Sequence, residues 1–534
     1  MKRKLISVLI AGLPALAMAD SGADIKSLKA LIQAQQQQLQ AQQQALQALQ
    51  KKVESFEQAQ AKAPAAASDE GSAPAQLSND DLAEIKQRVA ANELKVNNID
   101  KQMSEAPTGT VVPTPPLSGL SVTGYIDPAY IYNRNQGTGS FAFANHSNVY
   151  NYDNSTIGDV YLEIKKSFGT GPLAPFVDIS IMPNKGNGIT LLQNETGTNN
   201  NNNIINTANV TIPLSDTTQI VAGLIPSFGG YDVQQSNQMS TLTHNLLYDF
   251  SDPAAYLGAG FNWSHDVWAW KVFLGNEQAR TRQGSTAYTT NPVTGQQVTQ
   301  SNKVPTLTAR LDYTYSSTVD LGASVNIGRQ TLAQGTANTC TVGANNTVTC
   351  ATAPTGVYGY NSTQQYGGYY FAETDLTYTG VDDVYNAEID YGKQQHAAYN
   401  GGDAVWYGFS LQANHKFSTE KFGRMGITGR LDYLNNSKNG GGGGGIALGG
   451  AGTDFYNGFG ISPYCFAASA VNGTDCKGSN HADLTFDFLW YATDQATLKF
   501  EYRHDWTNLP VFLKNDGSFS KHNDILGTQL VYSF

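Results

Sequence analysis

The sequence lacks long apolar runs and is poor in charge. Beyond its first twenty residues it has no run of about 18 apolar residues, which excludes a membrane-spanning helix from that part. Charged residues make up only 14% of the 534 residues, whereas 53 Gly, 28 Tyr and 22 Phe are present. Few charges beside many aromatic residues are typical of a water-filled barrel, in which alternate residues face lipid and lumen.

Basic residues are also scarce, with 33 Lys and Arg against 44 Asp and Glu. Residues 1–19 are predicted to be an export signal. Lys2, Arg3 and Lys4 precede a short apolar core, and Ala17-Met18-Ala19 fits the small-x-small cleavage rule. Its removal leaves 30 basic against 44 acidic residues, a net charge of -14. Because so acidic a chain repels a polyanion, no nucleic-acid partner is expected.

Cysteine is rare, with four residues in two close pairs. Cys340 and Cys350 are ten positions apart, and Cys465 and Cys476 are eleven apart. In an exported protein this spacing predicts two local disulfides. Metal binding is the alternative, but no His lies near either pair with ligand spacing, so no metal site and no cofactor are predicted.

No group of residues indicates an enzyme. Some outer-membrane barrels are lipases or proteases, and His244 and His265 do lie near Ser and Asp residues. Proximity in one sequence does not show a catalytic triad, so no enzymatic activity is predicted. The glycine run 440–445 does not follow a strand-to-helix phosphate pattern, which argues against nucleotide binding.

Residues 20–60 are predicted to form a coiled coil, because core residues recur at alternating spacings of three and four. A disordered, low-complexity tract is the alternative for the Gln-rich run 33–50, but the regular apolar positions argue against it. Two polar layers in the core cost stability but can fix register and oligomer number. The two core series are Ile25, Ile32, Leu39, Leu46 and Val53, and Leu28, Gln35, Gln42, Leu49 and Phe56.

Three more segments follow before the first strand. Residues 61–77 are rich in Ala, Pro and Ser and are predicted to be a linker. Residues 78–104 continue the three/four spacing as a second coiled-coil helix, with Asn92 as its polar layer. Residues 105–118 contain four prolines, which forbid a helix and predict a stiff, extended spacer. With the signal removed, this whole region is expected in the periplasm.

Residues 119–534 are predicted to form an all-β transmembrane barrel of about 16 antiparallel strands. Strand patterns alternate with turns that are short on one side and connections that are long on the other. Residues 246–250 are assigned to a long connection, because one more strand would make the count odd. The predicted strands are 119–132, 156–168, 173–183, 203–213, 217–226, 254–264, 267–277, 303–316, 318–330, 366–379, 383–396, 402–417, 422–436, 481–492, 495–508 and 520–534.

The strands alternate apolar and polar residues with a period of two. In 495–508, for example, Leu498, Phe500 and Tyr502 oppose Lys499 and Glu501. A sandwich would place the apolar face inward and the charged face in solvent, and any single strand fits that alternative. The number of strands and the repeated difference between short and long connections favour the barrel instead. Sixteen strands leave an aqueous channel rather than a filled core.

The last strand has an apolar face that ends on an aromatic residue. Leu530, Tyr532 and Phe534 lie on that face, which a barrel needs because its last strand must pair with its first and face lipid. The strand resembles the terminal signature of bacterial outer-membrane barrels. That resemblance implies that these three residues form an assembly signal read by the barrel-assembly machinery.

The whole arrangement resembles the trimeric porins of Gram-negative bacteria, including sugar porins with a periplasmic coiled coil. The amino-acid sequence of the predicted barrel is similar to those of an uncharacterised family of predicted β-proteobacterial outer-membrane proteins. The stretches that carry this similarity are Leu120–Pro128, Met182–Thr190 and Pro226–Ser236. The resemblance implies a homotrimer in the bacterial outer membrane, in contact with lipid and lipopolysaccharide. It conveys no known substrate.

In sixteen-stranded porins the third loop folds into the lumen and narrows it. By that resemblance, the third long connection, 227–253, would form the constriction, with a plain extracellular loop as the alternative. The residues expected to line it are Tyr231, Asp232, His244, Tyr248, Asp249 and Asp252. This connection contains no Lys or Arg.

Charged residues on the polar faces of the strands are expected to line the lumen. Acidic candidates outnumber basic ones, and carboxylate rings favour cations, so a weak cation preference is predicted. Pairing of these charges across the wall is the alternative. The residues predicted for the lumen wall are Lys165, Arg310, Asp312, Glu373, Glu388, Arg430, Asp432, Lys499, Glu501 and Arg503.

These observations predict an outer-membrane porin for the passive diffusion of small hydrophilic solutes. Two alternatives remain open. The coiled coil predicts a structural tether from the outer membrane to peptidoglycan, with the barrel as its anchor. The abundance of aromatic residues predicts a stacking track in a substrate-specific, sugar-type channel.

Overall fold

The computed structural model describes most of the predicted barrel. The described residues are 119–143, 157–169, 171–182, 205–253, 255–277, 286–290, 297–301, 304–331, 340–342, 348–350, 366–398, 400–441, 453–454, 459–460 and 477–534. The predicted signal, both coiled-coil segments, the linker, the spacer, Cys465 and Cys476 lie outside these ranges. Among the described residues, no helix is long and apolar enough to cross a membrane.

The first barrel strand is bent and consists of two parts. β1 (Leu120–Ile126) pairs with the next barrel strand, and β2 (Ala129–Asn133) pairs with β3 (Thr138–Ala142), which forms a hairpin with it. Asp127 and Pro128 separate the two parts, and proline cannot donate to a ladder. β1 and β2 together therefore occupy one position in the barrel, and β3 adds none.

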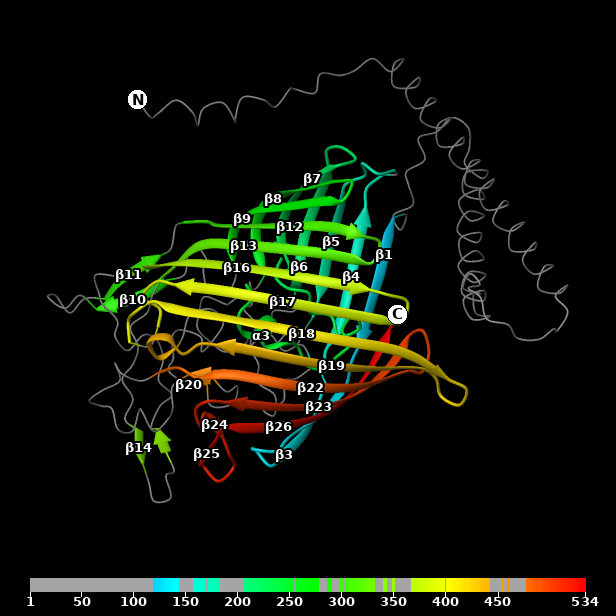
Figure 1. The fold of residues 1–534 in the computed structure, drawn as a ribbon. Coiled ribbons are helices and arrows are strands. Elements are labelled where there is room, and N and C mark those ends of the chain that lie inside the picture. The colour runs from blue at the N-terminus through cyan, green and yellow to red at the C-terminus, as the bar shows by residue number, and fades with distance from the viewer. Residues whose placement is uncertain are drawn as a thin grey trace, which may run out of the picture. The chain divides into compact units, whose positions relative to one another are not determined.

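Fifteen further strands complete the barrel, each antiparallel to its neighbours (Figure 1). All sixteen predicted strands are present. They are β4 (Val160–Ser167), β5 (Phe176–Ile181), β6 (Ile205–Pro213), β7 (Thr218–Ile225), β8 (Tyr256–His265), β9 (Trp268–Glu277), β12 (Thr306–Ser316), β13 (Val319–Thr331), β16 (Tyr366–Thr379), β17 (Asp383–Gln394), β18 (Ala404–Thr419), β19 (Gly423–Asn435), β22 (Asn480–Tyr491), β23 (Ala496–Thr507) and β26 (His522–Ser533).

The last strand closes the circle. β26 pairs with β23 on one side and with both β1 and β2 on the other. Gly124 and Phe534 exchange two backbone hydrogen bonds, of 3.0 and 2.9 Å. A Cβ added to Gly124 would lie 2.8 Å from the Phe534 ring, so the ring packs directly over this glycine. The predicted closed sixteen-strand barrel is confirmed.

The barrel is apolar outside and polar inside. On β22, Phe486 is 52% exposed, whereas Asp483 is 0% exposed on the opposite face. On β19, Ile427 and Leu431 are exposed while Arg430 is buried. A β-sandwich would show the reverse, so the sandwich alternative is excluded. A continuous exposed apolar outer face is stable where lipid covers it.

Four two-stranded hairpins lie in the long connections. They are β10 (Thr286–Thr290) with β11 (Gln297–Ser301), β14 (Cys340–Val342) with β15 (Val348–Cys350), β20 (Thr453–Asp454) with β21 (Phe459–Gly460), and β24 (Phe512–Leu513) with β25 (Phe519–Ser520). The backbone places Cys340 and Cys350 directly opposite each other in the β14–β15 ladder. The two disulfides stay predictions.

Residues 226–255, called the inserted loop below, connect β7 to β8 and fill part of the barrel. The loop contains the short helix α3 (Leu246–Phe250), beside β18 and β19 in Figure 1. The Asn245 side chain caps α3 by accepting from the Tyr248 amide at 2.6 Å. Leu246 and Phe250 belong to a buried apolar cluster that includes Trp406 of β18 and Ile525 of β26. The assignment of 246–250 to a connection is therefore correct, although the sequence did not reveal the helical turn.

The closing contact makes a prediction about assembly. Phe534→Ala removes the ring over Gly124 and the aromatic end of the strand that closes the barrel. We expect less assembled protein in the outer membrane, with unchanged single-channel conductance of the molecules that do insert. Phe500→Ala is the matched control, because it removes a similarly exposed ring from β23, which pairs with β26 but does not contact β1 in the ladder. Equal assembly of both variants would contradict a role for the terminal residue.

Candidate functional site

Positive side chains of the barrel wall bind the carbonyl groups of the inserted loop. Lys499 Nζ donates to the carbonyls of Ser236 (2.7 Å) and Thr241 (2.8 Å). Arg430 donates to the carbonyls of Thr243 (2.5 Å) and His244 (2.8 Å). Arg503 also donates to the His244 carbonyl, at 3.1 Å. All three cations are buried, so they face the loop rather than open water.

Negative side chains of the wall bind the amide groups of the same loop. Glu501 accepts from the amides of Leu242 (2.8 Å) and Thr243 (2.9 Å), and Asp432 accepts from the Leu246 amide (3.1 Å). An irregular backbone inside a barrel must find partners for these polar groups, because unpaired buried amides and carbonyls are costly. The wall supplies those partners.

The wall charges are also paired with one another. Arg430 contacts Asp432 at 3.0 Å, and Arg503 contacts Asp483 at 3.0 Å and Asp505 at 2.9 Å. Arg430 and Arg503 thus each have an opposite charge on the wall and a hydrogen-bond partner in the loop. Removing one member of such a set leaves an uncompensated buried charge, which is strongly destabilising.

The residues predicted to line the constriction mostly face protein. Asp232, His244, Asp249 and Asp252 are buried, whereas Tyr231 and Tyr248 are partly exposed. Asp232 accepts from the Asn245 amide at 2.9 Å, within the loop itself. The Tyr231 hydroxyl lies 2.7 Å from the Ser410 hydroxyl on β18, so it joins the loop to the wall.

The ten residues predicted for the lumen wall fall into two groups. Lys165, Arg310 and Asp312 are partly exposed. Lys165 lies over the Phe176 ring, and Arg310 pairs with Asp375 at 2.7 Å while donating to the Phe228 carbonyl at 2.9 Å. The other group is buried, chiefly beneath the inserted loop, and consists of Glu373, Glu388, Arg430, Asp432, Lys499, Glu501 and Arg503.

A second set of inward charges keeps contact with water. Glu163 and Lys165 on β4, Asp178 on β5, Lys271 on β9 and Asp312 on β12 are all partly exposed. Lys271 and Asp312 lie 3.5 Å apart with side chains 39% and 30% exposed. Among the described residues, these strands form the inner wall that the inserted loop covers least.

Two anchors of the loop were not found from the sequence. Asp127, at the bend between β1 and β2, accepts from the Ser236 hydroxyl at 2.6 Å and from the Gln529 amide group at 2.7 Å. The Asp-Pro pair that breaks the strand was a usable signal for this bend. Ser236 lies in a polar run, Gln234–Gln238, that carries no periodic pattern.

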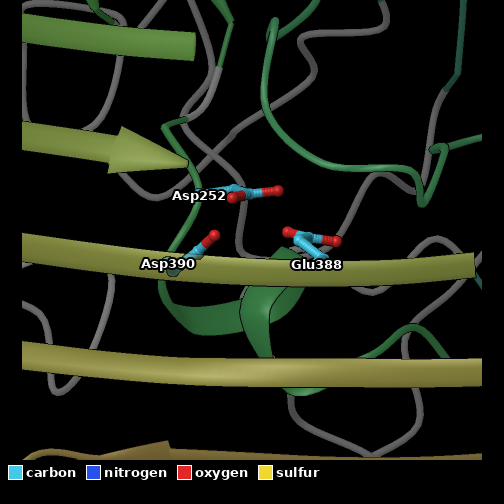
Figure 2. A group of neighbouring side chains, drawn as sticks. All are labelled: Asp252, Glu388 and Asp390. Atoms are coloured by element: carbon cyan, nitrogen blue, oxygen red, sulfur yellow. The ribbon is translucent and has the colours of Figure 1, made fainter. Parts of the chain in front are cut away.

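Three buried carboxylates also come together at the edge of the loop. Asp252 belongs to the loop, and Glu388 and Asp390 belong to β17; Figure 2 shows their carboxylates turned toward one another. One oxygen from each lies within 4.8 Å of the others. Only oxygen ligands are offered, which is the donor set of a hard divalent cation. Sequence spacing does not reveal the group, because the loop and β17 are far apart in the chain.

Burial changes the titration of the loop side chains. Burial of His244 lowers its pKa to about 4, and nearby Arg430 and Lys499 add to the effect against the opposing charge of Asp232. Its Nε2 lies 3.0 Å from the Val233 carbonyl, a distance that suits a neutral imidazole donating from Nε2. Burial likewise raises the pKa of the Tyr231 and Tyr248 hydroxyls, so both stay protonated.

Comparison with known families assigns the chain. A family model described as "Protein of unknown function (DUF3138)" matches residues 1–534. The chain belongs to this family. No curated protein matches it. The function of this family member therefore has to be argued from its own residues.

Solved structures similar to this DUF3138 member are outer-membrane proteins at low sequence identity. Outer-membrane expressed OmpT of Vibrio cholerae has a TM-score of 0.44 and 8% identity, with 78% of this chain and 97% of that chain covered. The outer membrane channel DcaP of Acinetobacter baumannii has a TM-score of 0.42 and 10% identity, with the same coverage. Salmonella typhi OmpF in complex with daunomycin has a TM-score of 0.40 and 10% identity, again with the same coverage.

The contacts of Arg430 with the inserted loop and with the wall carboxylates predict that its replacement lowers the free energy of unfolding strongly. Arg430→Met leaves Asp432 and Asp483 without their shared partner and releases the carbonyls of Thr243 and His244. We expect a loss of about 3–5 kcal/mol in the free energy of unfolding in detergent. Thermolysin should also cleave the inserted loop faster. Arg424→Met, an exposed arginine on the same strand, should change stability by about 0.5 kcal/mol or less. Equal effects of both would contradict the anchoring role.

The His244 environment predicts that acid loosens the loop. A pKa of about 4 in the docked loop lies below the ordinary value of about 6.5, so the released loop binds the proton more tightly. Docking is therefore at full strength above pH 6.5 and weakens as pH falls toward 4, by roughly 3 kcal/mol.

Hydrogen exchange of loop peptides at pH 7 and pH 5, corrected for intrinsic rates, measures this effect. In His244→Gln the loss of protection at pH 5 should be smaller than in the native chain. Asp232, Asp249, Arg430 and Lys499 surround the site in both proteins, so the difference between them isolates the imidazole. The same pH dependence in both would contradict the prediction.

Proposed function

We propose that this protein is an outer-membrane porin, which lets small hydrophilic solutes diffuse through a water-filled barrel. The observation that carries the proposal is the reversed burial of the sixteen strands, with exposed apolar residues outside and buried polar residues inside. That pattern suits a barrel surrounded by lipid and hydrated within. The inserted loop supports the proposal further, because it occupies part of the barrel interior and leaves part of the polar inner wall uncovered.

We propose that the aqueous passage runs between the inserted loop and the inner wall of β4, β5, β9 and β12. The loop is hydrogen-bonded to β17, β18, β19, β22, β23 and β26 through side chains that are mostly buried. On the other side, Arg310 of β12 donates to the Phe228 carbonyl of the loop. Glu163, Lys165, Asp178, Lys271, Arg310 and Asp312 on β4, β5, β9 and β12 remain partly exposed, whereas Glu277 at the end of β9 is buried. A solute would meet this second wall, together with the partly exposed side chains of the loop, Tyr231 and Tyr248 among them.

Ion preference depends on the charges of the inner wall. The described part of that wall has three partly exposed acids and three partly exposed basic residues, namely Glu163, Asp178 and Asp312, and Lys165, Lys271 and Arg310. These partly exposed charges balance, so the proposed weak cation preference rests on the acidic excess among all the inward-facing charges of the predicted strands. We propose in addition a homotrimer in the outer membrane with the amino-terminal coiled coil in the periplasm, on the strength of the sequence patterns alone.

Reversal potentials in planar bilayers test the pore and its wall together. The native protein should conduct, with a reversal potential in a KCl gradient that indicates weak cation preference. Glu163→Gln with Asp178→Asn should move that potential toward anion preference, and Lys165→Gln should move it the other way. Asp516→Asn, an exposed acid in the β24–β25 connection, is the control and should leave it unchanged. Absence of conductance would overturn the porin proposal.

The same bilayers distinguish a general porin from a substrate-specific channel. A general porin shows current reduced only in proportion to the volume of added solute. A sugar-type channel shows current blocked by one sugar with saturation. Phe228, Tyr256 and Phe273 pack against one another beside the proposed passage, and Tyr256 and Phe273 are buried. Because buried rings offer a solute no open stacking surface, the general porin is the function we favour.

A further inference from the structure

Five acidic side chains gather where the inserted loop meets β16 and β17. Glu373 lies opposite Asp390 and Asp375 lies opposite Glu388 in the β16–β17 ladder, and Asp252 reaches them from the loop. Like charges directly opposite each other on neighbouring strands are destabilising. All five residues are buried, at 7% exposure or less. Such a group requires a positive partner.

Arg310 neutralises only part of this negative charge. Arg310 pairs with Asp375 at 2.7 Å and with Glu373 at 3.5 Å. Among the described residues, no Lys, Arg or His forms an ion pair within 4.0 Å with Glu388 or Asp390, whereas Arg310 pairs with their neighbours on β16. Two of the three carboxylates that lie closest together, those of Glu388 and Asp390, are therefore contacted by no described basic side chain.

Two of these side chains have oxygens aimed into the group that lack good hydrogen bonds. Glu388 and Asp390 are each 1% exposed. Oε1 of Glu388 and both carboxylate oxygens of Asp390 accept no hydrogen bond of normal geometry. In Figure 2 these carboxylates point toward the Asp252 carboxylate rather than along the strand. Buried carboxylate oxygens without a hydrogen-bond donor point to an ion or another ligand that binds to them directly.

The backbone of the loop is shaped to approach the same carboxylates. A Cβ on Gly229 would lie 2.9 Å from Cγ of Asp252, and one on Gly230 would lie 2.8 Å from Oε1 of Glu388. Gly230 also has a φ of +67°, which favours glycine. The glycine pair lets the chain pass close to the group without a side chain entering it.

We propose that Asp252, Glu388 and Asp390 bind one Ca²⁺ ion, which ties the carboxyl-terminal end of the inserted loop to β17. Two oxygens bound to Ca²⁺ at about 2.4 Å lie at most about 4.8 Å apart, which matches the spread of the three ligands. Ca²⁺ suits an all-oxygen site with three carboxylates, whereas Mg²⁺ keeps more of its water and Zn²⁺ prefers nitrogen and sulfur.

Terbium luminescence of the purified full-length protein in detergent tests this site. Tb³⁺ replaces Ca²⁺ in oxygen sites, and Trp406 can sensitise it, because the indole nitrogen donates to the Ser251 hydroxyl at 3.0 Å, next to Asp252. We expect saturable emission with one ion per chain, which Ca²⁺ displaces at far lower concentration than Mg²⁺. Glu388→Gln and Asp390→Asn should each weaken Ca²⁺ binding about tenfold or more.

Asp487→Asn is the matched control, because Asp487 is also a buried wall carboxylate that accepts from the loop, at the Leu242 amide, yet lies outside the group. It should bind Ca²⁺ as the native chain does. Calorimetric titration of the native protein with Ca²⁺ keeps the test decisive if a variant fails to assemble. No saturable Ca²⁺ binding by the native protein, or binding that both group variants leave unchanged, would overturn the site. The result is independent of whether the barrel conducts.

Discussion

An irregular loop inside a closed barrel must have its backbone satisfied by the wall, and this requirement organises the interior. The inserted loop contains no Lys or Arg, so the cations that bind its carbonyls come from the strands. Lys499, Arg430 and Arg503 take the carbonyls, and Glu501 and Asp432 take the amides. Basic and acidic residues alternate along β19 and β23, as in Arg430 and Asp432 or Lys499 and Glu501. This alternation matches the loop backbone, which presents both carbonyl acceptors and amide donors to the wall.

In this arrangement the inward charges of β16 to β26 differ in role from those of β4 to β12. The strands from β16 to β26 use their charges to hold the loop, and those charges are buried. The strands from β4 to β12 keep Glu163, Lys165 and Asp178 in contact with water. The charge available to a passing solute is therefore smaller than the number of inward charges in the sequence. Under the proposed function, selectivity would therefore depend on few residues and stability on many.

The middle of the loop and its carboxyl-terminal end are attached by different chemistry. Near its middle, Lys499 and Arg430 supply positive charge within hydrogen-bonding distance. At its carboxyl-terminal end, Asp252 brings a further negative charge to a wall that is already acidic at Glu388 and Asp390. The proposed divalent cation would play the same part at that end as Lys499 and Arg430 play near the middle, because a positive charge again joins the loop to the wall. The loop position and the proposed passage then both depend on that ion.

Local patterns in the sequence determined the barrel. The period of two, the turn positions and the aromatic end of the last strand are properties of neighbouring residues, so the sixteen strands and the closure of β26 on β1 were predicted correctly. The inward orientation of residues such as Arg430 and Glu501 follows from the same alternation.

The tertiary structure alone decided what those inward residues meet. Alternation tells which side of a strand a residue faces, but it carries no information on which part of the lumen another segment occupies. For that reason the sequence could not separate the buried Arg430 from the accessible Lys165, or bring Asp252 to Glu388. Those contacts arise only when the loop, which has no periodic pattern, packs against strands far along the chain, because backbone hydrogen bonding and charge pairing at that surface select its position.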